Sequence, residues 1–201
     1  MSSKPYQWSL LVALTLGLVA SQISPPYPKQ QLLQHSPTVI AIVLLALASR
    51  RQLFSNATMT CMVLFVSLHI FGARYIYTYV PLGESLEWLS LERGAPVRNH
   101  YDRLVHLAFG VLAICPAVEA ARRFGGLGLG WAKAVAFLFV LAVSAFYESF
   151  EWLLTMIAAP ELADRYNGQQ GDTWDAQKDM ALATLGALAA LPFVGRSTDS
   201  V

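Results

Sequence analysis

Acidic and basic side chains recur at helical spacing in the C-terminal half of the chain. The three sets are Asp102/His106 at i,i+4, Glu148/Glu151 at i,i+3, and Asp172/Asp175/Asp179 at i,i+3,i+7. Residues at these spacings share one face of a helix, so each set forms a stripe. Carboxylates and imidazoles bind divalent metal ions and also act as general acids and bases. The pattern therefore predicts a metal site or proton-transfer chemistry.

The rest of the chain is too apolar for a water-soluble domain. Of 201 residues, 55% are hydrophobic and 13% are charged, about half the charged share of a typical globular protein. The formal net charge of +1 provides no basic surface for nucleic acid. Cys61 and Cys115 lie inside apolar runs without CxxC spacing, which excludes a disulfide scaffold or thiolate zinc site and makes them small buried hydrophobes. The composition predicts an all-α membrane protein surrounded by lipid.

A single transmembrane domain is expected over residues 1–201. Because a hydrocarbon core of about 30 Å needs about 20 apolar residues per helix, the chain offers six spans. They are roughly 6–23, 37–51, 57–80, 102–121, 131–158 and 174–194. The second span is short enough to be interfacial or re-entrant, although QLLQH before it would add a helical turn. The first also resembles the apolar region of a signal peptide, but five further spans favour an uncleaved helix.

The stripes converge if the spans alternate in direction. The ends of the third and fifth spans and the starts of the fourth and sixth then lie at the same membrane face, around one cavity. We expect metal ligands at Asp102, His106, Glu148, Glu151 and Asp179, with Glu148 or Asp179 as general base. Around these ligands we expect His69 at the floor of the cavity, together with Arg74, Arg103, Asp172, Asp175 and Lys178.

Charge balance favours a bound cation. A charged side chain at bilayer depth costs about 2.5–3.5 kcal/mol, and carboxylates close together raise one another's pKa. Arg74, Arg103 and Lys178 supply three positive charges against six carboxylates. A divalent ion would supply most of the remainder, and mixed histidine and carboxylate ligands suit zinc, manganese or iron.

Simpler interpretations exist for several of these residues. Asp172 with Asp175, and Asn99 with Asp102, also fit an N-cap followed by an acid in the first helical turn. Inside the spans, Glu148 and Glu151 also fit intramembrane ion pairs with Arg74, Arg103 or Lys178, and His69 also fits a hydrogen-bonded core histidine. Asp179 and His106 lie past the first turn, so capping does not explain them.

Arginine placement predicts the orientation in the membrane. The pairs Arg50/Arg51 and Arg122/Arg123 lie in short loops on the same side as Lys4, which indicates the cytoplasmic side. Both termini are then cytoplasmic, and the loops 81–100 and 159–172 are outside. Arg93, Arg98 and Arg165 oppose this bias, although nearby acids dilute them.

Longer motifs resemble a known family. The segments are HIFGARYIYTYVPLG, RNHYDRLVHLAFG, YESFEW and GQQGDTWDAQKDMALATLGAL. They resemble the signature blocks of the YjdF-type bacterial inner-membrane family, a domain of unknown function, over most of the chain from about residue 30. This resemblance implies a polytopic inner-membrane protein and brings no established activity with it.

A more distant similarity is to VanZ-like membrane proteins, with their Asp-Lys-x-x-His, Glu-x-x-Gln and Asp-x-x-x-Asn-x-x-Gly elements. The matching segments here are DRLVH, ESFE and DMALATLG. Asp102 and His106 match the first element, Glu148 the second, and Asp179 with Gly186 the third. The departures are Arg103 for lysine, Glu151 for glutamine and Ala183 for asparagine.

Three classes of function fit the sequence. The first is metal-assisted hydrolysis or group transfer on a lipid or lipid-linked envelope substrate. The second is a proton- or cation-coupled transporter that uses the same carboxylates. The third is a non-catalytic scaffold, a partner of another membrane protein in which the charges hold helices together. Motifs for a serine nucleophile, a P-loop or dinucleotide binding do not occur.

Overall fold

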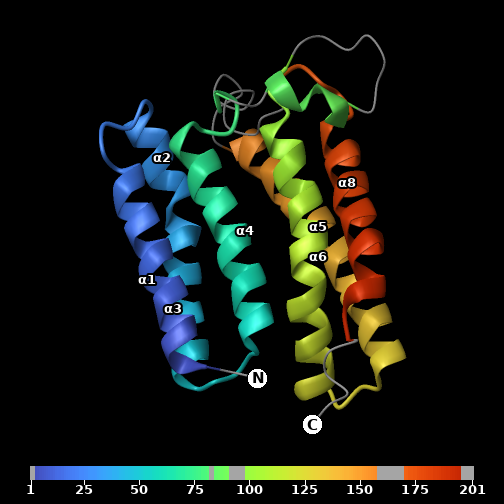
Figure 1. The fold of residues 1–201 in the computed structure, drawn as a ribbon. Coiled ribbons are helices and arrows are strands. Elements are labelled where there is room, and N and C mark those ends of the chain that lie inside the picture. Colours follow the sequence, from blue (N-terminus) through green and yellow to red (C-terminus); the bar gives the residue numbers. More distant parts are fainter. Residues whose placement is uncertain (1–2, 82–83, 91–97, 158–169, 196–201) are drawn as a thin grey trace.

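The computed structural model describes residues 3–81, 84–90, 98–157 and 170–195, and every regular element in that part of the chain is helical. The α-helices are α1 (Lys4–Ser21), α2 (Pro28–Gln34), α3 (Ser36–Arg50), α4 (Asn56–Arg74), α5 (Tyr101–Arg123), α6 (Leu129–Ile157) and α8 (Asp175–Ala190), and the 3-10 helices are η1 (Glu84–Leu89) and η2 (Leu191–Phe193). Helix α3 continues α2 in the same direction, and apart from this pair the successive α-helices alternate in direction (Figure 1). The expected all-α membrane fold is confirmed.

Some of the described helices are long and apolar enough to cross a membrane. They are Pro28–Arg50, Asn56–Arg74, Tyr101–Arg123 and Leu129–Leu154. The first of these joins α2 to α3 through a turn at His35, so the segment QLLQH lengthens the predicted second span to 23 residues. Helices α1 and α8 are not among these candidates, and their membrane crossing stays a prediction.

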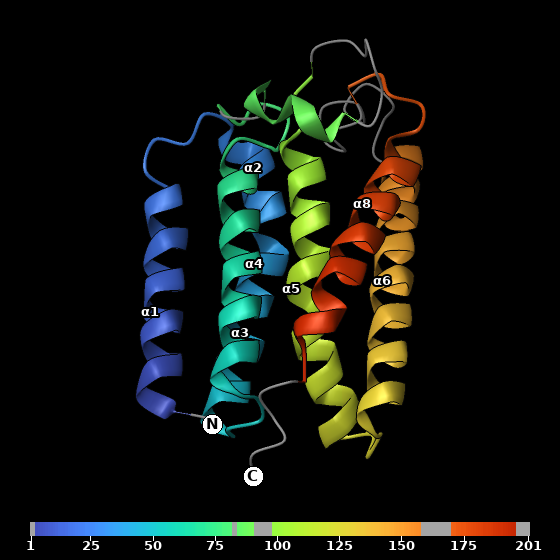
Figure 2. The same ribbon diagram turned by 45° about the vertical axis from the view of Figure 1, so that its right-hand side comes forward.

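The helices form two groups with separate cores. One group packs α1, α3 and α4 around Leu14, Met59 and Val63. The other packs α5, α6 and α8 around Ile114 and Val140. The two groups meet where α4 lies beside α5 (Figures 1 and 2). A smaller cluster, made by Val80, Tyr101 and Val105 with neighbouring aromatic rings, joins them at one end of the bundle.

Two glycines let α8 lie directly against α5, across which it runs in Figure 2. A Cβ atom on Gly110 would overlap the carbonyl oxygen of Ala183, and one on Gly186 would overlap the carbonyl oxygen of Leu107. Small residues of this kind allow the backbones of membrane helices to touch. The contact fixes the side chains of α8 relative to those of α5.

A strained turn follows α4. Ile76 and Tyr77 have φ values of +47° and +56°, in the left-handed region that β-branched and bulky residues rarely adopt. The amide of Tyr77 donates to the carbonyl of Gly72 at 2.8 Å, and a Cβ on Gly72 would lie 2.8 Å from the tyrosine ring. The turn therefore folds Tyr77 back against the end of α4.

Candidate functional site

The centre of the site is formed by Asp102 and His106 of α5 and Asp179 of α8. One ligand atom from each residue lies within 4.8 Å of the other two, and all three side chains are buried. Asp179 is 1% exposed, and its Oδ1 atom has no hydrogen-bond partner in the described part of the protein. The three donor atoms are close enough to share one cation, and we call this group the acid centre.

Glu148 of α6 joins the acid centre from a third helix. Its Oε1 atom lies 3.3 Å from Nε2 of His106, and Oδ1 of Asp102 lies 3.8 Å from the same nitrogen. Oε1 of Glu148 makes no hydrogen bond to a described residue. The stripes of α5, α6 and α8 therefore meet.

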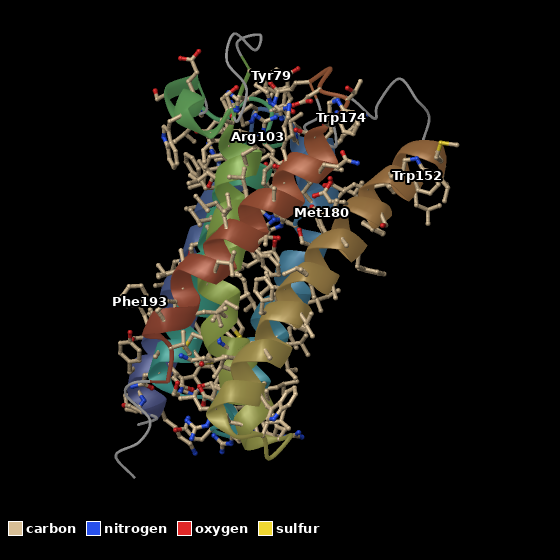
Figure 3. All side chains as sticks on the ribbon, turned by 90° about the vertical axis from the view of Figure 1, so that its right-hand side faces the viewer. Tyr79, Arg103, Trp152, Trp174, Met180 and Phe193 are labelled. Carbon is tan, nitrogen blue, oxygen red and sulfur yellow. The ribbon has the colours of Figure 1, made fainter. Side chains whose placement is uncertain are left out.

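A groove of about 440 Å³ opens beside Glu148, between the C-terminal part of α6 and the start of α8. Glu151 and Asp175 also line it. Figure 3 shows the region: α6 diverges from α8 toward Trp152, while Met180 lies on α8. Glu151, a predicted ligand, thus lies in the groove beside the acid centre rather than in its most compact group.

Asp172 and Asp175 belong to a separate layer of ion pairs. Arg98 Nη1 is 2.6 Å from Asp175 Oδ1 and 3.3 Å from Asp172 Oδ2. Arg103, near the N-terminal end of α5 (Figure 3), also contacts Asp172. Lys178 Nζ lies 2.8 Å from Asp172 Oδ2. This ion-pair layer joins the loop before α8 to α5.

The charges of this layer shift the pKa values of its members at the helix ends. Burial alone would raise the pKa of Asp172, but hydrogen bonds from Lys178 and from the amide of Trp174, with the charge of Arg103, lower it below its ordinary value. Burial and the neighbouring charges of Arg103 and Arg98 lower the pKa of His100 to about 4. At neutral pH Asp172 is therefore an anion and His100 is neutral.

Local hydrogen bonds to backbone amides are present at Asn99 and Asp172, but they do not account for all the contacts of Asp172. Asn99 Oδ1 accepts from the amide of Tyr101 at 3.0 Å, at the start of α5. Asp172 Oδ1 accepts from the amide of Trp174 at 3.0 Å, yet Asp172 also lies within the ion-pair layer. The N-cap position of α8 is Trp174, which makes no side-chain capping bond.

The proposed basic partners of Glu148 are engaged elsewhere. The described ion pairs of Arg103 and Lys178 go to Asp172, with Asp175 a second partner of Arg103. Arg74 donates to the backbone carbonyls of Ser21 and Ile23. The described contact of Glu148 at ion-pair distance is with Nε2 of His106, at 3.3 Å.

His69 belongs to a second, uncharged polar region. Its Nε2 atom lies 3.0 Å from the carbonyl oxygen of Gln34, and Nδ1 lies 2.6 Å from the hydroxyl of Tyr77. Because a carbonyl only accepts, Nε2 carries the proton and Nδ1 accepts from Tyr77. His69 lines the same cavity as His106, and both of its ring nitrogens already have hydrogen-bond partners. This geometry matches the hydrogen-bonded core histidine.

The same region extends to His35. Its Nε2 lies 3.2 Å from Ser21 Oγ and 3.1 Å from Gln31 Nε2, while Nδ1 lies 3.3 Å from Thr38 Oγ1. The rings of His35 and His69 meet edge to face, with centroids 6.5 Å apart. We call these residues, with Tyr77 and His69, the neutral network.

Sequence reasoning missed the roles of Arg98, Tyr77 and Ser144. The sequence presents Arg98 only as a loop charge that opposes the orientation bias, although it stands next to the Asn99/Asp102 block. Tyr77 reaches His69 only through the left-handed turn. Ser144 interrupts an apolar run four residues before Glu148, and that i,i+4 spacing is the signal that would have found it.

Comparison with known proteins identifies the family. Residues 6–200 match the family described as "Predicted membrane protein (DUF2238)". The chain belongs to this family. It is also 36% identical over 189 residues to inner membrane protein YjdF of Escherichia coli (strain K12), which covers 92% of this chain and 87% of that relative. No solved structure matches significantly. The YjdF-type resemblance of this DUF2238 member is confirmed, and the VanZ-like similarity is not shown and stays a hypothesis.

Proposed function

We propose that the protein is a multi-pass inner-membrane protein whose acid centre binds a divalent cation. The observation that carries the proposal is the compact group of Asp102, His106 and Asp179, in which one buried aspartate oxygen has no partner among the described residues. The name of the relative YjdF supports the inner membrane as the location. Zinc, manganese and iron are the ions that suit this mixed ligand set.

The electrostatics of the acid centre supports a bound cation rather than carboxylates without a compensating charge. A buried carboxylate is stable as an anion only when a positive charge or several hydrogen bonds compensate it. The described ion pairs of Arg98, Arg103 and Lys178 are made with Asp172 and Asp175 instead. A cation at the acid centre would supply the missing charge, with Glu148 or Glu151 completing the ligand set.

The chemistry that fits is metal-assisted hydrolysis of an ester or phosphoester in a lipid or lipid-linked envelope substrate. A bound divalent ion lowers the pKa of a coordinated water toward neutrality. Glu148, which lies between the acid centre and the groove, is placed to accept the proton of a water arriving through that groove. Asp179 is the other candidate base if Glu148 is a ligand.

Metal content tests the cation. Protein purified in detergent, loaded with zinc, manganese or iron and then desalted should retain about one ion per chain by elemental analysis. Asp179→Asn should lose most of that metal. Glu119→Gln is the matched control. Glu119 lies in α5 away from the acid centre and accepts hydrogen bonds from the backbone amide and the hydroxyl of Ser55, the residue before α4. Wild-type protein that retains none of the three metals would reject the proposal.

A proton- or cation-coupled carrier is the second candidate. The observation that favours it is that Asp179 Oδ1 and Glu148 Oε1 are both buried without a hydrogen-bond partner among the described residues, as expected of groups that bind and release protons. A carrier predicts pH-dependent flux in proteoliposomes that Asp179→Asn abolishes. The absence of flux with retained metal favours the enzyme, and the absence of both favours the scaffold.

We further propose that both termini are cytoplasmic, as the arginine pairs indicate. Cysteine labelling in a Cys61→Ala, Cys115→Ala background tests this orientation. Trp88 is suitable for substitution because it is 66% exposed in η1, whereas its neighbour Ser90 is buried. A reagent that does not cross the membrane should label Trp88→Cys in spheroplasts and leave Gly128→Cys, in the loop before α6, unlabelled. The reverse pattern would reverse the orientation.

A further inference from the structure

We propose that a cavity next to the acid centre holds one hydrocarbon chain of a lipid substrate, with the polar linkage of that lipid at Asp102 and His106. The inference rests on the proposed function, since it names the class of substrate for the same site. The cavity is lined by α3, α4, α5 and α6, and its volume is about 270 Å³. It is separate from the groove that Glu148 and Glu151 line, and the two spaces share no lining residue.

The walls of the cavity are mainly apolar. The hydrophobic lining residues are Pro37, Ala41, Phe65, Val66, Val105, Phe109 and Val143. A dry cavity of about 150 Å³ holds one benzene ring, so the space here accommodates roughly ten carbon atoms of a chain. A polar ligand of that size would leave most of its hydrogen bonds unmade.

Two regions of the cavity wall carry polar groups, and they differ in what they offer a ligand. Asp102 and His106 line one wall, and His69 with Tyr77 lines another. The His69–Tyr77 pair is already hydrogen-bonded, so it offers little to a ligand. A molecule that fills the cavity and reaches the acid centre must be apolar over most of its length and polar at one end.

Ser144 is the second observation that points to a ligand. Its side chain is 2% exposed, lines the cavity, and its Oγ atom has no hydrogen-bond partner among the described residues. Serines inside helices commonly donate to the carbonyl four residues earlier, as Ser149 does to Ala145 at 2.7 Å. Ser144 stands one helical turn from Glu148. Its hydroxyl is therefore placed to donate to an oxygen of the lipid linkage.

The cavity is accessible from the side of the bundle. Its rim includes Pro37 of α3 and Tyr147 of α6, both exposed, while Thr38, Val66 and Ser144 form the buried wall. Among the described helices, α3 and α6 are not one of the pairs that pack extensively. Both belong to membrane-span candidates, so an opening between them faces lipid rather than water. A bilayer lipid can thus insert one chain without leaving the membrane.

Photolabelling tests the inference in the full chain. The protein is reconstituted in phosphatidylethanolamine and phosphatidylglycerol nanodiscs with a phospholipid that carries a diazirine on one acyl chain. We expect label on Phe65 and Phe109, saturable by the same lipid without diazirine. Val143→Phe, which fills the cavity, should reduce that label by about tenfold. Label on Leu138, which is 62% exposed, should be unchanged, and Val135→Phe on the exposed side of α6 is the matched control.

A milder variant protects the test against misfolding. Ser144→Ala removes one hydroxyl, so saturation of the cavity label should need about three- to tenfold more competing lipid, as expected for a single lost hydrogen bond. Ser149→Ala, whose hydroxyl has a backbone partner, should not change it. Label confined to outward residues, or cavity label unchanged by both Val143→Phe and Ser144→Ala, would overturn the inference.

Metal removal separates this inference from the proposed function. The cavity walls are apolar and do not depend on a cation, so Asp179→Asn and chelator-treated protein should keep the saturable label. Saturable label in a protein that binds no metal would overturn the proposed function alone. Bound metal without cavity label would overturn the lipid site alone.

Discussion

The acid centre and the neutral network are two buried polar regions that both contribute residues to the lining of one cavity, and they differ in charge and in hydrogen bonding. In the neutral network each imidazole has a partner at both ring nitrogens, although the amide oxygens of Gln31 and Gln34 have none among the described residues. In the acid centre, carboxylates crowd one histidine, and Asp179 and Glu148 each keep an unpartnered oxygen. The first arrangement stabilises a fold, and the second is incomplete without a further ligand or proton.

The largest expected effect concerns the ion-pair layer next to the acid centre. Arg103 is 1% exposed and contacts Asp172, so Arg103→Gln removes a buried cation from a layer in which Arg98 and Lys178 remain, and it should lower the free energy of unfolding by up to about 3–5 kcal/mol. Arg74→Gln, beside the neutral network, removes hydrogen bonds to two carbonyls and a cation–π contact with Tyr75, and it should cost about 1–3 kcal/mol. Thermal or denaturant unfolding in detergent measures both. Equal losses of unfolding free energy for Arg103→Gln and Arg74→Gln would contradict the proposed difference between the ion-pair layer and the neutral network.

A matched pair of histidines tests which region binds metal. A cation that binds only the folded protein stabilises it by about 2.7 kcal/mol at a hundredfold excess over Kd, so chelator should lower the Tm measurably. His106→Ala should abolish this chelator effect. His69→Ala should lower the Tm through lost hydrogen bonds and keep the chelator effect intact. A chelator effect lost in His69→Ala and retained in His106→Ala would exchange the roles of the two regions.

The tyrosine of the neutral network provides a smaller test. Tyr77→Phe removes the hydroxyl that donates to His69, and the expected loss is about 1 kcal/mol of stability. Metal content and the chelator effect should not change, because the described hydrogen bond of the Tyr77 hydroxyl goes to His69, which is not a member of the acid centre. A drop in metal content would instead connect the two regions across the cavity.

The smallest effect at neutral pH is expected for His100. In the unfolded chain a histidine titrates near pH 6.5, whereas the pKa of His100 in the folded protein is about 4. Between these values the unfolded chain binds a proton that the folded protein does not, so stability falls as the pH falls from about 6.5 to about 4. His100 is 1% exposed and its Nδ1 accepts a hydrogen bond from Arg103, which a glutamine oxygen can also accept, so His100→Gln should cost at most about 1 kcal/mol at pH 7 and flatten this slope. Asp172, whose pKa is lowered, adds a loss only at still lower pH.

The part of the site that sequence could predict follows from helix geometry. Spacings of three and four residues place Asp102 with His106 on one face, and alternating helices bring α5, α6 and α8 together at one end. These two facts suffice to bring Asp179 and Glu148 toward His106, as the structure shows. Long apolar stretches likewise suffice for the all-α membrane fold.

The rest depends on conformations that periodicity does not encode. The division of the acids between the acid centre and the ion-pair layer depends on Arg98, whose position is set by the segment before α5 and not by a helical repeat. The hydrogen bonding of His69 depends on Tyr77, which a left-handed turn places against it. Ser144 has a helical spacing to Glu148, but an isolated serine in an apolar run indicates little by itself.

The contact between Gly110 and Gly186 restricts how the acid centre can move. Because the two backbones touch there, α8 cannot slide along α5 without collision between carbonyl and Cα atoms. The motion that remains is a tilt of α8 about this contact. The part of α8 on the N-terminal side of Gly186 carries Asp179 and begins at Asp175, whose Oδ1 atom lies 2.6 Å from Nη1 of Arg98. A tilt of α8 that opens the acid centre toward the groove therefore requires the ion-pair layer to break first. These salt bridges oppose that motion.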